Sequence, residues 1–488
     1  MTTRTALVTG ATGYVGSKLV GILARNGWGV KVLVRSAQKA RRMPWASLIT
    51  DCEEGCHPGH VYVVEGDANN AFDVEAALEG VSVAWYLLHS MGNEREFVEE
   101  ERSMAQIFAG AVERAGTERI VFLGALAPLG EKSAHLESRR EVGQILASSG
   151  ALTVGLSAGL VIGERSSSFA MLRHLAERLP VIVAPSWMHN RITPISEKDL
   201  LYLLESAGSA PISESRLFDI GSAEEVSYVE MLTRYIDHFG LRRRAVWTAP
   251  IANARTAAWI IGLLTPVDRH LAEPLLSSMV HDTVVIERDF REVVGEPPGG
   301  LDDIDEAYAA TASFIKPWRW RRIFAGVTGL VTAAATVGSA FTAVNSPWYR
   351  SLNQPAWKPP RWLFPVAWSF LYADIALMSA LTLADIGEAD PSDVSTDTAT
   401  SDLTREESEF IAALAVNLGL NAAWPCVFFN RKNLPGAVVE GSLLATSSAD
   451  LVRRVWRVNT GRGIALAPYA LWTAYAATLT FGVVRRNR

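Results

Sequence analysis

The hydropathy of the C-terminal third limits the fold of this chain more than any other feature. A helix needs about 20 mostly apolar residues to cross a hydrocarbon core of roughly 30 Å, and five stretches have that length. They are 323–344, 363–384, 410–429, 437–456 and 464–484. The first runs for 22 residues without a charge, whereas the fourth is weaker because it carries Glu440, Asp450, Arg453 and Arg454. Counting all five, the sequence predicts an all-α bundle of five transmembrane helices over 323–488.

The segments around these stretches differ in character. A basic and aromatic collar, 316–322, precedes the first one, and residues 301–322 as a whole are predicted to be a linker. Nine of the 15 tryptophans lie from Trp318 onward, as expected of side chains that anchor helices at membrane interfaces. The segment 385–409 has nine acidic residues and one arginine, so it lacks the apolar surface that a core needs. We predict that it is a disordered loop.

The first 240 residues have the pattern of a soluble α/β domain. Short apolar runs alternate with helical patterns at the spacing of βαβ units, which predicts a doubly wound parallel sheet with helices on both faces. Residues 241–300 are helical and less regular, so we assign the domain to 1–300 with a substrate-side region at its end. The first apolar run, 5–9, is a short strand and not a signal peptide, which predicts a cytosolic domain.

Composition argues against two classes of protein. A net charge of −6, from 46 basic and 52 acidic residues, provides no large positive field for binding nucleic acid. The only cysteines are Cys52, Cys56 and Cys426. Three cysteines do not make a disulfide framework, and they fit a reducing compartment.

A glycine-rich turn lies between the first predicted strand and the first predicted helix. Its residues are Gly10, Ala11, Thr12, Gly13, Tyr14, Val15 and Gly16. In a dinucleotide-binding turn, Gly10 permits the tight bend, Gly13 lets the backbone approach a pyrophosphate, and Gly16 lets the helix pack on the strand. The N-terminus of the helix then faces the phosphates. The alternative is a glycine-rich turn without a ligand.

Two charged residues at strand ends indicate which dinucleotide binds. Arg35 ends the second strand, where an NAD site typically has an acid for the ribose hydroxyls, and arginine suits a 2′-phosphate through bidentate bonds. Arg41 and Arg42 can assist it, and Asp67, after the third strand, is a candidate adenine contact. We predict NADP(H) as the cofactor, with NAD(H) as the alternative. The alternative for Arg35 is an ordinary solvated arginine without a ligand. The alternative for Asp67 is a residue that only forms the turn at the end of its strand.

This half resembles the short-chain dehydrogenase/reductase superfamily, in its extended or atypical branch, over about residues 3–240. The resemblance rests on the glycine turn, on Gly66-Asp67, and on the later segments 194–199 and 219–222. It implies a Rossmann fold that binds NAD(P)(H) and a catalytic Tyr-x-x-x-Lys pair.

The catalytic part departs from that pattern. His135 stands at the tyrosine position and Arg139 at the lysine position, and the preceding strand ends without a hydroxyl. His135 can act as an acid and Arg139 can hold ribose, although an arginine does not easily join a proton relay. Ser90 and Ser138 are the other candidate hydroxyls. The alternative is a binding-only domain with His135 exposed on a helix, so the sequence leaves open whether the chain is an enzyme.

Two short segments each have a functional and a structural interpretation. Four potential zinc ligands are grouped at Cys52, Cys56, His57 and His60. Their spacing is not that of a standard zinc site, so a polar loop is the favoured interpretation and no metal is expected. The apolar run 257–264 is too short to span a bilayer. We expect it to cap a substrate cleft or to touch the membrane surface.

The C-terminal third has the residues of a ligand cavity. A loop that proline stiffens, with Trp357, Pro359 and Trp362, can cover the mouth of that cavity. Polar side chains inside spans tend to face the bundle interior, and here they are Asp374, Asn417, Asn421 and Glu440. A cavity for a flat hydrophobic ligand would be lined by Trp368, Asn421, Trp424, Phe428 and Trp472. The alternative is that these aromatic residues only pack between helices.

These residues closely resemble the translocator protein family, also known as the TspO or tryptophan-rich sensory protein family, over about 323–488. The motifs that carry the resemblance are Trp357-Lys-Pro-Pro-Arg-Trp362, Pro365-Val-Ala-Trp368, Asn421-Ala-Ala-Trp424 and Pro468-Tyr469-Ala-Leu-Trp472. It implies five membrane helices, frequent dimerisation, and binding of porphyrins and sterol-like ligands. Thr480 and Phe481 depart from the family's last span, and Phe481 replaces the tyrosine of a proposed sterol motif.

Three functions remain open from the sequence. The first is a redox-linked sensor, transporter or ligand-modifying protein that binds NADP(H) and a tetrapyrrole. The second is a non-catalytic scaffold, and the third is an oxidoreductase acting on a membrane-derived lipid or isoprenoid. Basic residues are nearly balanced across the predicted spans. The predicted orientation, with the N-terminal domain on the cytoplasmic side of the cell membrane, therefore rests on the cytosolic cofactor.

Overall fold

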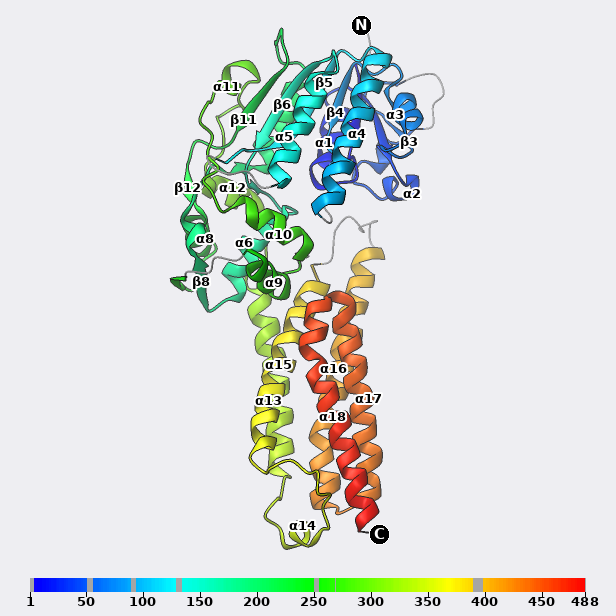
Figure 1. Cartoon of the computed structure of the whole chain (residues 1–488), viewed down its shortest axis with the longest axis vertical. Coiled ribbons are helices and arrows are strands. Elements are labelled where there is room, and N and C mark those ends of the chain that lie inside the picture. The colour runs from blue at the N-terminus through cyan, green and yellow to red at the C-terminus, as the bar shows by residue number, and fades with distance from the viewer. Residues whose placement is uncertain are drawn as a thin grey trace. The chain divides into compact units, whose positions relative to one another are not determined.

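The computed structural model describes residues 4–50, 56–88, 94–128, 134–249, 254–267, 269–388 and 398–487 (Figure 1). The chain forms two compact units. Within the described residues, the N-terminal unit runs to Gly262 and resumes over Val267–Lys316. The C-terminal unit holds Leu263–Pro266 and the chain from Pro317 onward.

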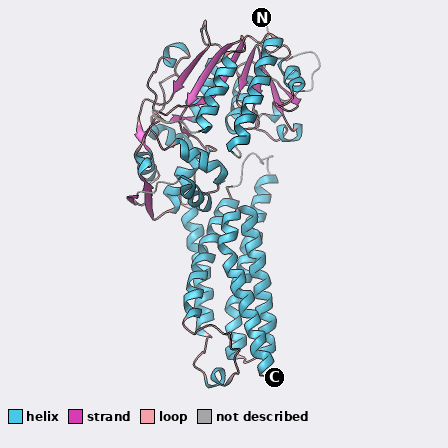
Figure 2. Cartoon of the chain, in the orientation of Figure 1, coloured by secondary structure: helices cyan, strands magenta, loops and turns pink. Residues whose placement is uncertain are grey.

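A seven-stranded sheet is the centre of the N-terminal unit (Figure 2). Its strands are β1 (Thr5–Thr9), β2 (Gly29–Val34), β3 (Val61–Glu65), β4 (Val83–Tyr86), β5 (Arg119–Ala125), β6 (Leu152–Ala158) and β11 (Arg216–Ile220). Their order is β11-β6-β5-β4-β1-β2-β3, and every neighbouring pair is parallel. The direction of winding reverses at β1, which lies between β2 and β4. The predicted doubly wound α/β fold is confirmed.

Helices cover both faces of this sheet, and the side chains of β1 show how. Successive side chains of a strand point to opposite faces, so Ala6 and Val8 enter one buried cluster while Leu7 enters another. The first cluster takes in α1 (Tyr14–Arg25) and α7 (Glu197–Ala207). The second takes in α3 (Ala71–Leu78), α4 (Glu94–Ala115) and α5 (Ala134–Ala147).

A second lobe of the N-terminal unit has its own apolar core. It consists of α6 (Ser167–Arg178), β8 (Val181–Pro185), α8 (Tyr228–His238), β13 (Ala245–Ala249), α9 (Ala254–Leu264), α10 (Arg269–Ser278) and α12 (Ile304–Thr311). β8 and β13 pair as a small parallel sheet. The remaining short elements are α2 (Ala37–Ala40), η1 (Ala46–Leu48), β7 (Val161–Ile162), η2 (Ser186–His189), β9 (Arg191–Ile192), β10 (Ile195–Ser196), β12 (Val226–Ser227) and α11 (Phe290–Val293).

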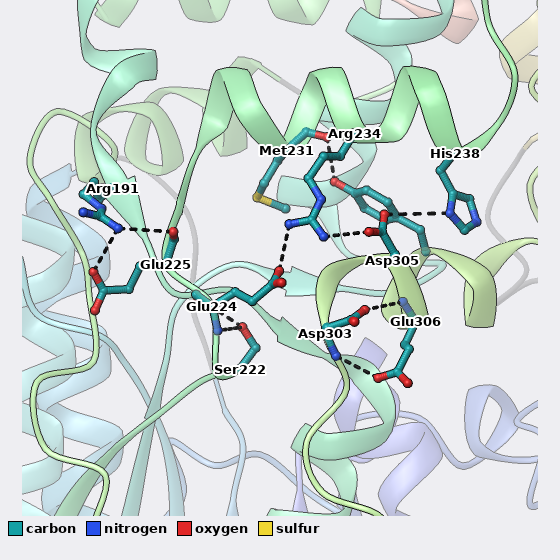
Figure 3. Close-up of polar contacts among 11 residues, drawn as sticks. Arg191, Ser222, Glu224, Glu225, Met231, Arg234, His238, Asp303, Asp305 and Glu306 are labelled. Atoms are coloured by element: carbon teal, nitrogen blue, oxygen red, sulfur yellow. Dashed lines mark hydrogen bonds and ion pairs between the residues drawn. The ribbon is translucent and has the colours of Figure 1, made fainter.

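The acidic start of the predicted linker 301–322 is helical. Asp303 caps α12, because its carboxylate accepts the Glu306 backbone N–H at 2.8 Å and the Glu306 carboxylate accepts the Asp303 N–H at 3.0 Å (Figure 3). Ile304 and Tyr308, four residues apart on one face, are buried in the core of the second lobe. The apolar face of a short helix therefore draws this acidic stretch into the domain.

An ion-pair network holds α12 against α8. Arg234 donates to Glu224 at 2.8 Å and to Asp305 at 2.6 Å, so one guanidinium joins two acids from different segments (Figure 3). The Tyr308 hydroxyl donates to the Met231 carbonyl at 2.8 Å. These contacts hold α12 within the N-terminal unit, which continues to Lys316.

The C-terminal unit is a helical bundle with a buried apolar core. Its helices are α13 (Arg319–Ala340), α14 (Pro347–Ser351), α15 (Leu363–Ile386), α16 (Thr398–Pro425), the π-helical turn η4 (Cys426–Asn430), α17 (Leu434–Val458) and α18 (Thr460–Arg486). Among its described residues, four stretches are long and apolar enough to cross a membrane, namely Arg319–Ala340, Leu363–Ile386, Arg405–Asn430 and Thr460–Arg486. α17 has the length but is not among these four, so the fifth span stays a prediction.

The segment 385–409, expected to be a disordered loop, is helical at both of its described ends. α15 continues to Ile386, and α16 begins at Thr398. The Arg319 guanidinium donates to the Ala384 carbonyl and forms an ion pair with Glu407, so one arginine of α13 binds both α15 and α16. Glutamate and arginine are also good helix formers. The prediction of disorder considered only the acidic composition of the segment and not this helix propensity. The middle of the segment lies outside the described residues.

Candidate functional site

The glycine turn lies where the winding of the sheet reverses, directly after β1 and beside the end of β4. Gly10 has a φ of +68°, and a Cβ there would lie 2.6 Å from the Leu87 carbonyl oxygen. A Cβ on Gly16 would lie 2.3 Å from the Gly10 carbonyl oxygen. Both positions therefore require glycine for space, and Gly10 also for its backbone conformation. Crevices at such reversal points are where ligands bind in open α/β sheets.

The N-terminus of α1 opens at this crevice. Gly13 is the exposed N-cap residue, and within the described chain no side chain caps the helix. The Gly13 N–H donates to the Gly10 carbonyl at 2.9 Å, which closes the turn. The first turn of α1 contains no acid, and the half-buried Thr12 and Val15 flank the N-cap. Backbone N–H groups and the helix dipole thus suit an anion here.

The side chain of Tyr14, a predicted cofactor contact, is bound by protein groups. Its hydroxyl donates to Glu197 at 2.5 Å, and Lys18, one turn further along α1, donates to the other oxygen of the same carboxylate at 2.5 Å. Burial, and then the charge of Glu197, raise the pKa of Tyr14 above its ordinary value. Tyr14 therefore ties the start of α1 to the start of α7. Glu197 and Lys18 were not among the predicted site residues, although Glu197 lies in the segment 194–199 that carries the family resemblance.

A cavity of about 420 Å³ adjoins this cluster. Its wall includes Ile22 of α1 and Asn26 directly after it, Glu197 and Tyr202 of α7, and Phe314. The cavity lies along the C-terminal half of α1, whereas the glycine turn lies at its beginning. It is therefore separate from the position that the phosphates of a dinucleotide would take.

Arg35 and Asp67 lie at the ends of adjacent strands, as the sequence predicted for a ribose and adenine site. Both are exposed, Arg35 directly after β2 and Asp67 two residues after β3. Asp67 accepts the Asn69 backbone N–H at 2.9 Å, so its carboxylate also supports a turn. The Glu65 carboxylate accepts the Ala37 N–H at 3.1 Å and places a negative charge near Arg35. An exposed arginine at this strand end is available to a 2′-phosphate.

Arg139 is buried, and its guanidinium is bound by protein groups. It donates to the carbonyl of Leu88 at 3.0 Å and to that of Leu123, and forms an ion pair with Glu101 at 3.5 Å. Ser138 also donates to Glu101, at 2.7 Å. Arg139 thus supports the ends of β4 and β5, which does not favour the predicted contact with ribose. His135 lies in the first turn of α5, but its side chain, like Ser90, lies outside the described residues.

The Cys/His segment does not form a ligand set in the part of the chain that the structure describes. Cys56 is half-buried, and burial raises its pKa. His57 and His60 are exposed. No group of three His, Cys, Asp or Glu side chains suited to a metal ion occurs among the described residues, and Cys52 lies outside them.

A buried polar network connects four helices of the bundle. The Tyr372 hydroxyl of α15 donates to Asn421 at 2.7 Å, and the Tyr469 hydroxyl of α18 donates to Asn417 at 2.7 Å. The Asn421 amide donates to the Tyr469 hydroxyl at 3.4 Å, and the Asn417 amide reaches Ser448 of α17 at 3.1 Å. Asn417 and Asn421 were predicted to face the interior. Tyr372, Tyr469 and Ser448 complete the network.

The aromatic residues predicted to line one cavity divide between two buried clusters, with Trp368 and Trp472 against one and Trp424 and Phe428 in the other. Trp424 stacks on Phe428 with ring centroids 4.9 Å apart, in a cluster against which Trp348 and Tyr349 of α14 also pack. The ring centroid of Trp368 lies 5.3 Å from that of Tyr372, which belongs to the polar network. The rings of Trp472 and Trp357 both pack against the ring of Tyr475, with ring centroids 5.8 and 5.7 Å apart, respectively. Pro359 and the exposed Trp362 lie further along the same loop as Trp357.

Two acids of the bundle stand apart from these contacts. Within the described residues, neither carboxylate oxygen of the half-buried Glu440 on α17 has a hydrogen-bond partner. One carboxylate oxygen of Asp374 on α15 is likewise buried without a hydrogen-bond partner among the described residues. Acids in such positions inside a bundle are costly, and they mark places where a ligand, an ion or a proton is handled.

Comparison with known proteins agrees with this division of the chain. Residues 327–486 match the model of the TspO/MBR family. Protein CrtK of Rhodobacter capsulatus is 33% identical over 159 residues, which are 32% of this chain and 88% of that protein.

The chain belongs to the TspO/MBR family.

The TspO/MBR domain is also similar to the translocator protein of Ovis aries, with 30% identity over 142 residues, 29% of this chain and 75% of that protein. Residues 10–152 match a family of NAD(P)H-binding domains. The chain is therefore a fusion of an NAD(P)-binding Rossmann domain with a TspO/MBR membrane domain. Among solved structures, triphenylmethane reductase of Citrobacter sp. has a TM-score of 0.50 and 15% identity, covering 64% of this chain and all of that one; this likeness shows the fold alone.

Proposed function

We propose that this protein binds NADP(H) in its Rossmann domain and a tetrapyrrole, or a similarly flat hydrophobic ligand, in its TspO/MBR bundle. In this proposal the protein is a redox-linked sensor, transporter or ligand-modifying protein of the cell membrane, with five spans and a cytoplasmic N-terminal domain. The observation that carries the proposal is the turn Gly10–Gly16, which excludes side chains at the reversal point of the sheet and opens an uncapped helix N-terminus.

The position of Arg35 supports NADP(H) over NAD(H). Removing the guanidinium in Arg35→Ala is expected to weaken NADPH binding by about 1.5–3 kcal/mol, or roughly tenfold to a hundredfold, because charge-assisted hydrogen bonds to the 2′-phosphate are lost. NADH lacks that phosphate, so its affinity should change little. Calorimetric titration of full-length protein with both cofactors measures these effects.

Arg25→Ala is the matched control, because Arg25 is an exposed arginine at the opposite end of α1 from the glycine turn. It should bind NADPH as the wild type does. Equal affinity of the wild type for NADH and NADPH would contradict the proposed cofactor preference.

The interior of the bundle supports a ligand with polar atoms on a flat apolar body. Trp368 lies beside Tyr372, whose hydroxyl bonds to Asn421, so an aromatic face and a polar network adjoin. Aromatic faces stack on planar ligands, and the amide of Asn421 supplies a hydrogen bond. Glu440 adds an acid on α17.

The double variant Asn421→Ala/Trp368→Phe is expected to weaken protoporphyrin binding roughly tenfold to a hundredfold, because a hydrogen bond and part of an aromatic contact are lost. Quenching of tryptophan fluorescence in lipid nanodiscs measures the affinity. Trp456→Phe is the control, since this residue of α17 is 46% exposed. Unchanged affinity in the double variant would place the pocket elsewhere. Repeating both titrations with the other ligand saturating tests redox linkage, because coupling between two sites is reciprocal.

A further inference from the structure

The second lobe of the N-terminal unit encloses a cavity that the proposed function does not use. Its volume is about 110 Å³, and α6, β8, α9 and α10 all contribute to its wall. Nearly every lining side chain is hydrocarbon or thioether, and three are methionines, namely Met171, Met188 and Met279. Apolar cavities of this size stay dry and accept apolar ligands, and methionine adapts its shape to them.

The few polar groups of the wall do not suit a ligand headgroup. The Tyr228 hydroxyl is buried and bonded to Thr283, and burial raises the pKa of Tyr228. Ser168 is the other polar lining residue, in the first turn of α6. A ligand here is therefore held by its hydrocarbon part, and its polar end must remain outside the cavity.

The mouth of the cavity lies on an exposed apolar face. Val183 of β8 and Ile260 of α9 both line the cavity, yet 51% and 39% of their surfaces are exposed. Trp247 of β13 pairs directly with Val183 and is 68% exposed, and Trp259 of α9 is 53% exposed. Two residues that line the cavity therefore also belong to this exposed apolar face.

Exposed apolar side chains concentrate on these elements. Ten large apolar residues of the described N-terminal unit are exposed, and five of them lie on β8, β13 and α9: Val181, Val183, Trp247, Trp259 and Ile260. A soluble surface seldom gathers such residues without a partner.

Charge around this face favours a lipid surface as its partner. Arg242 and Arg243 are exposed immediately before β13, and Arg255 is exposed at the start of α9. Asp237 and Glu273 pair with two of them at 3.3 Å, in exposed ion pairs that water weakens. Arginine and tryptophan beside exposed apolar residues are typical of proteins that lie on an anionic bilayer. The TspO/MBR domain holds the chain at a membrane, so a lipid surface is always present at high effective concentration.

We propose that this cavity binds the hydrocarbon chain of a membrane lipid, acyl or isoprenoid, which enters from the bilayer surface between β8 and α9. The site is distinct from the glycine turn and from the bundle interior, and it gives the Rossmann domain a lipid ligand of its own. Failure of this proposal leaves the binding of NADP(H) and porphyrin untouched, and failure of those leaves the lipid site untouched.

Photo-cross-linking of the full-length protein in nanodiscs that contain anionic phosphatidylglycerol tests the proposal. The probe is palmitic acid with a diazirine in the middle of its chain, and mass spectrometry locates the adducts after digestion. We expect adducts on peptides of α6, β8 or α9 in addition to those on the bundle. Ala257→Phe fills the cavity and should reduce the yield of adducts on α6, β8 and α9 roughly tenfold. This is the factor expected when about two methylene groups can no longer be buried. Adducts on the bundle should not change.

Thr256→Phe is the matched control, because it adds the same ring at the neighbouring, exposed position that does not line the cavity. Retained NADPH affinity shows that a variant is folded. If Ala257→Phe loses NADPH affinity, the variant Ile260→Asn is tested in its place. Ile260 is a partly exposed residue that lines the cavity, and the same loss of adducts is expected. Absence of adducts on all three elements, or equal labelling in the filled and wild-type proteins, would overturn the lipid site.

Discussion

Gly10→Ala is expected to lower the NADPH affinity of the full-length protein at least about thirtyfold, the factor that corresponds to 2 kcal/mol. Two costs combine at this position. A left-handed backbone at φ +68° costs a non-glycine residue roughly 1–2 kcal/mol. The new Cβ would also lie 2.6 Å from the Leu87 carbonyl oxygen, a backbone atom next to β4, and overpacking of this kind costs about 1–3 kcal/mol. The turn must shift, and the phosphate position shifts with it.

Gly80→Ala separates these two costs. Gly80 has the same φ of +68°, but a Cβ there meets no atom within 4 Å. It should therefore lower stability slightly and leave NADPH affinity unchanged. Calorimetry measures affinity for both variants, and protoporphyrin quenching checks that the bundle is intact. Comparable affinity losses in Gly10→Ala and Gly80→Ala would mean that crowding at the turn is not what matters.

The turn and the sheet were readable from the sequence because their signals are local. A strand, a glycine-rich bend and a helix follow one another within 25 residues, and the spacing of the glycines reflects contacts such as that between Gly16 and Gly10. The contact between Tyr14 and Glu197 spans 183 positions. Nothing in the spacing of either segment indicates that partner, so the role of Tyr14 was assigned incompletely.

Arg139 shows the limit of assigning a role from position alone. The sequence resemblance places Arg139 at a lysine position and predicts a ribose contact, which stays a prediction. The structure buries its guanidinium against two carbonyls and Glu101. A buried guanidinium needs such partners to offset the loss of hydration, and the sequence does not show that they are present. The acidic residues around α12 hid its apolar face in a similar way, since Ile304 and Tyr308 occupy only a few positions among carboxylates.

In the bundle, too, features set by local sequence were predictable, whereas features set by the packing of distant segments were not. Helix lengths follow from hydropathy, and the interior position of Asn417 and Asn421 follows from the cost of polar groups in lipid. The grouping of the tryptophans depends on how the helices pack against one another. Trp424 therefore lies with Phe428 and Trp348, while Trp368 lies with Tyr372, a division that the spacing of these residues does not contain.

Arg462→Leu is expected to destabilise the C-terminal unit by about 3–5 kcal/mol, because it leaves a buried carboxylate without its cation. The Arg462 side chain is fully buried and forms an ion pair with Asp385 at 2.7 Å, where Asp385 is 5% exposed. The same guanidinium donates to the carbonyls of Leu263 at 2.7 Å and Thr265 at 3.1 Å, which belong to the same unit. Unfolding of the full-length protein by SDS in mixed micelles measures the change.

A double-mutant cycle identifies the ion pair as the cause. Asp385→Leu alone leaves the arginine charge buried and should be as harmful as Arg462→Leu, whereas the double variant Arg462→Leu/Asp385→Leu leaves no isolated charge. It should therefore be less destabilised than the sum of the single variants, with a remaining loss from the two carbonyls that Arg462 bound. Arg453→Leu is the control, because its pair with Asp450 is exposed and should contribute at most about 1 kcal/mol. Strict additivity of the single variants would show that the charges act separately, and that the ion pair does not hold the end of α15 to the start of α18.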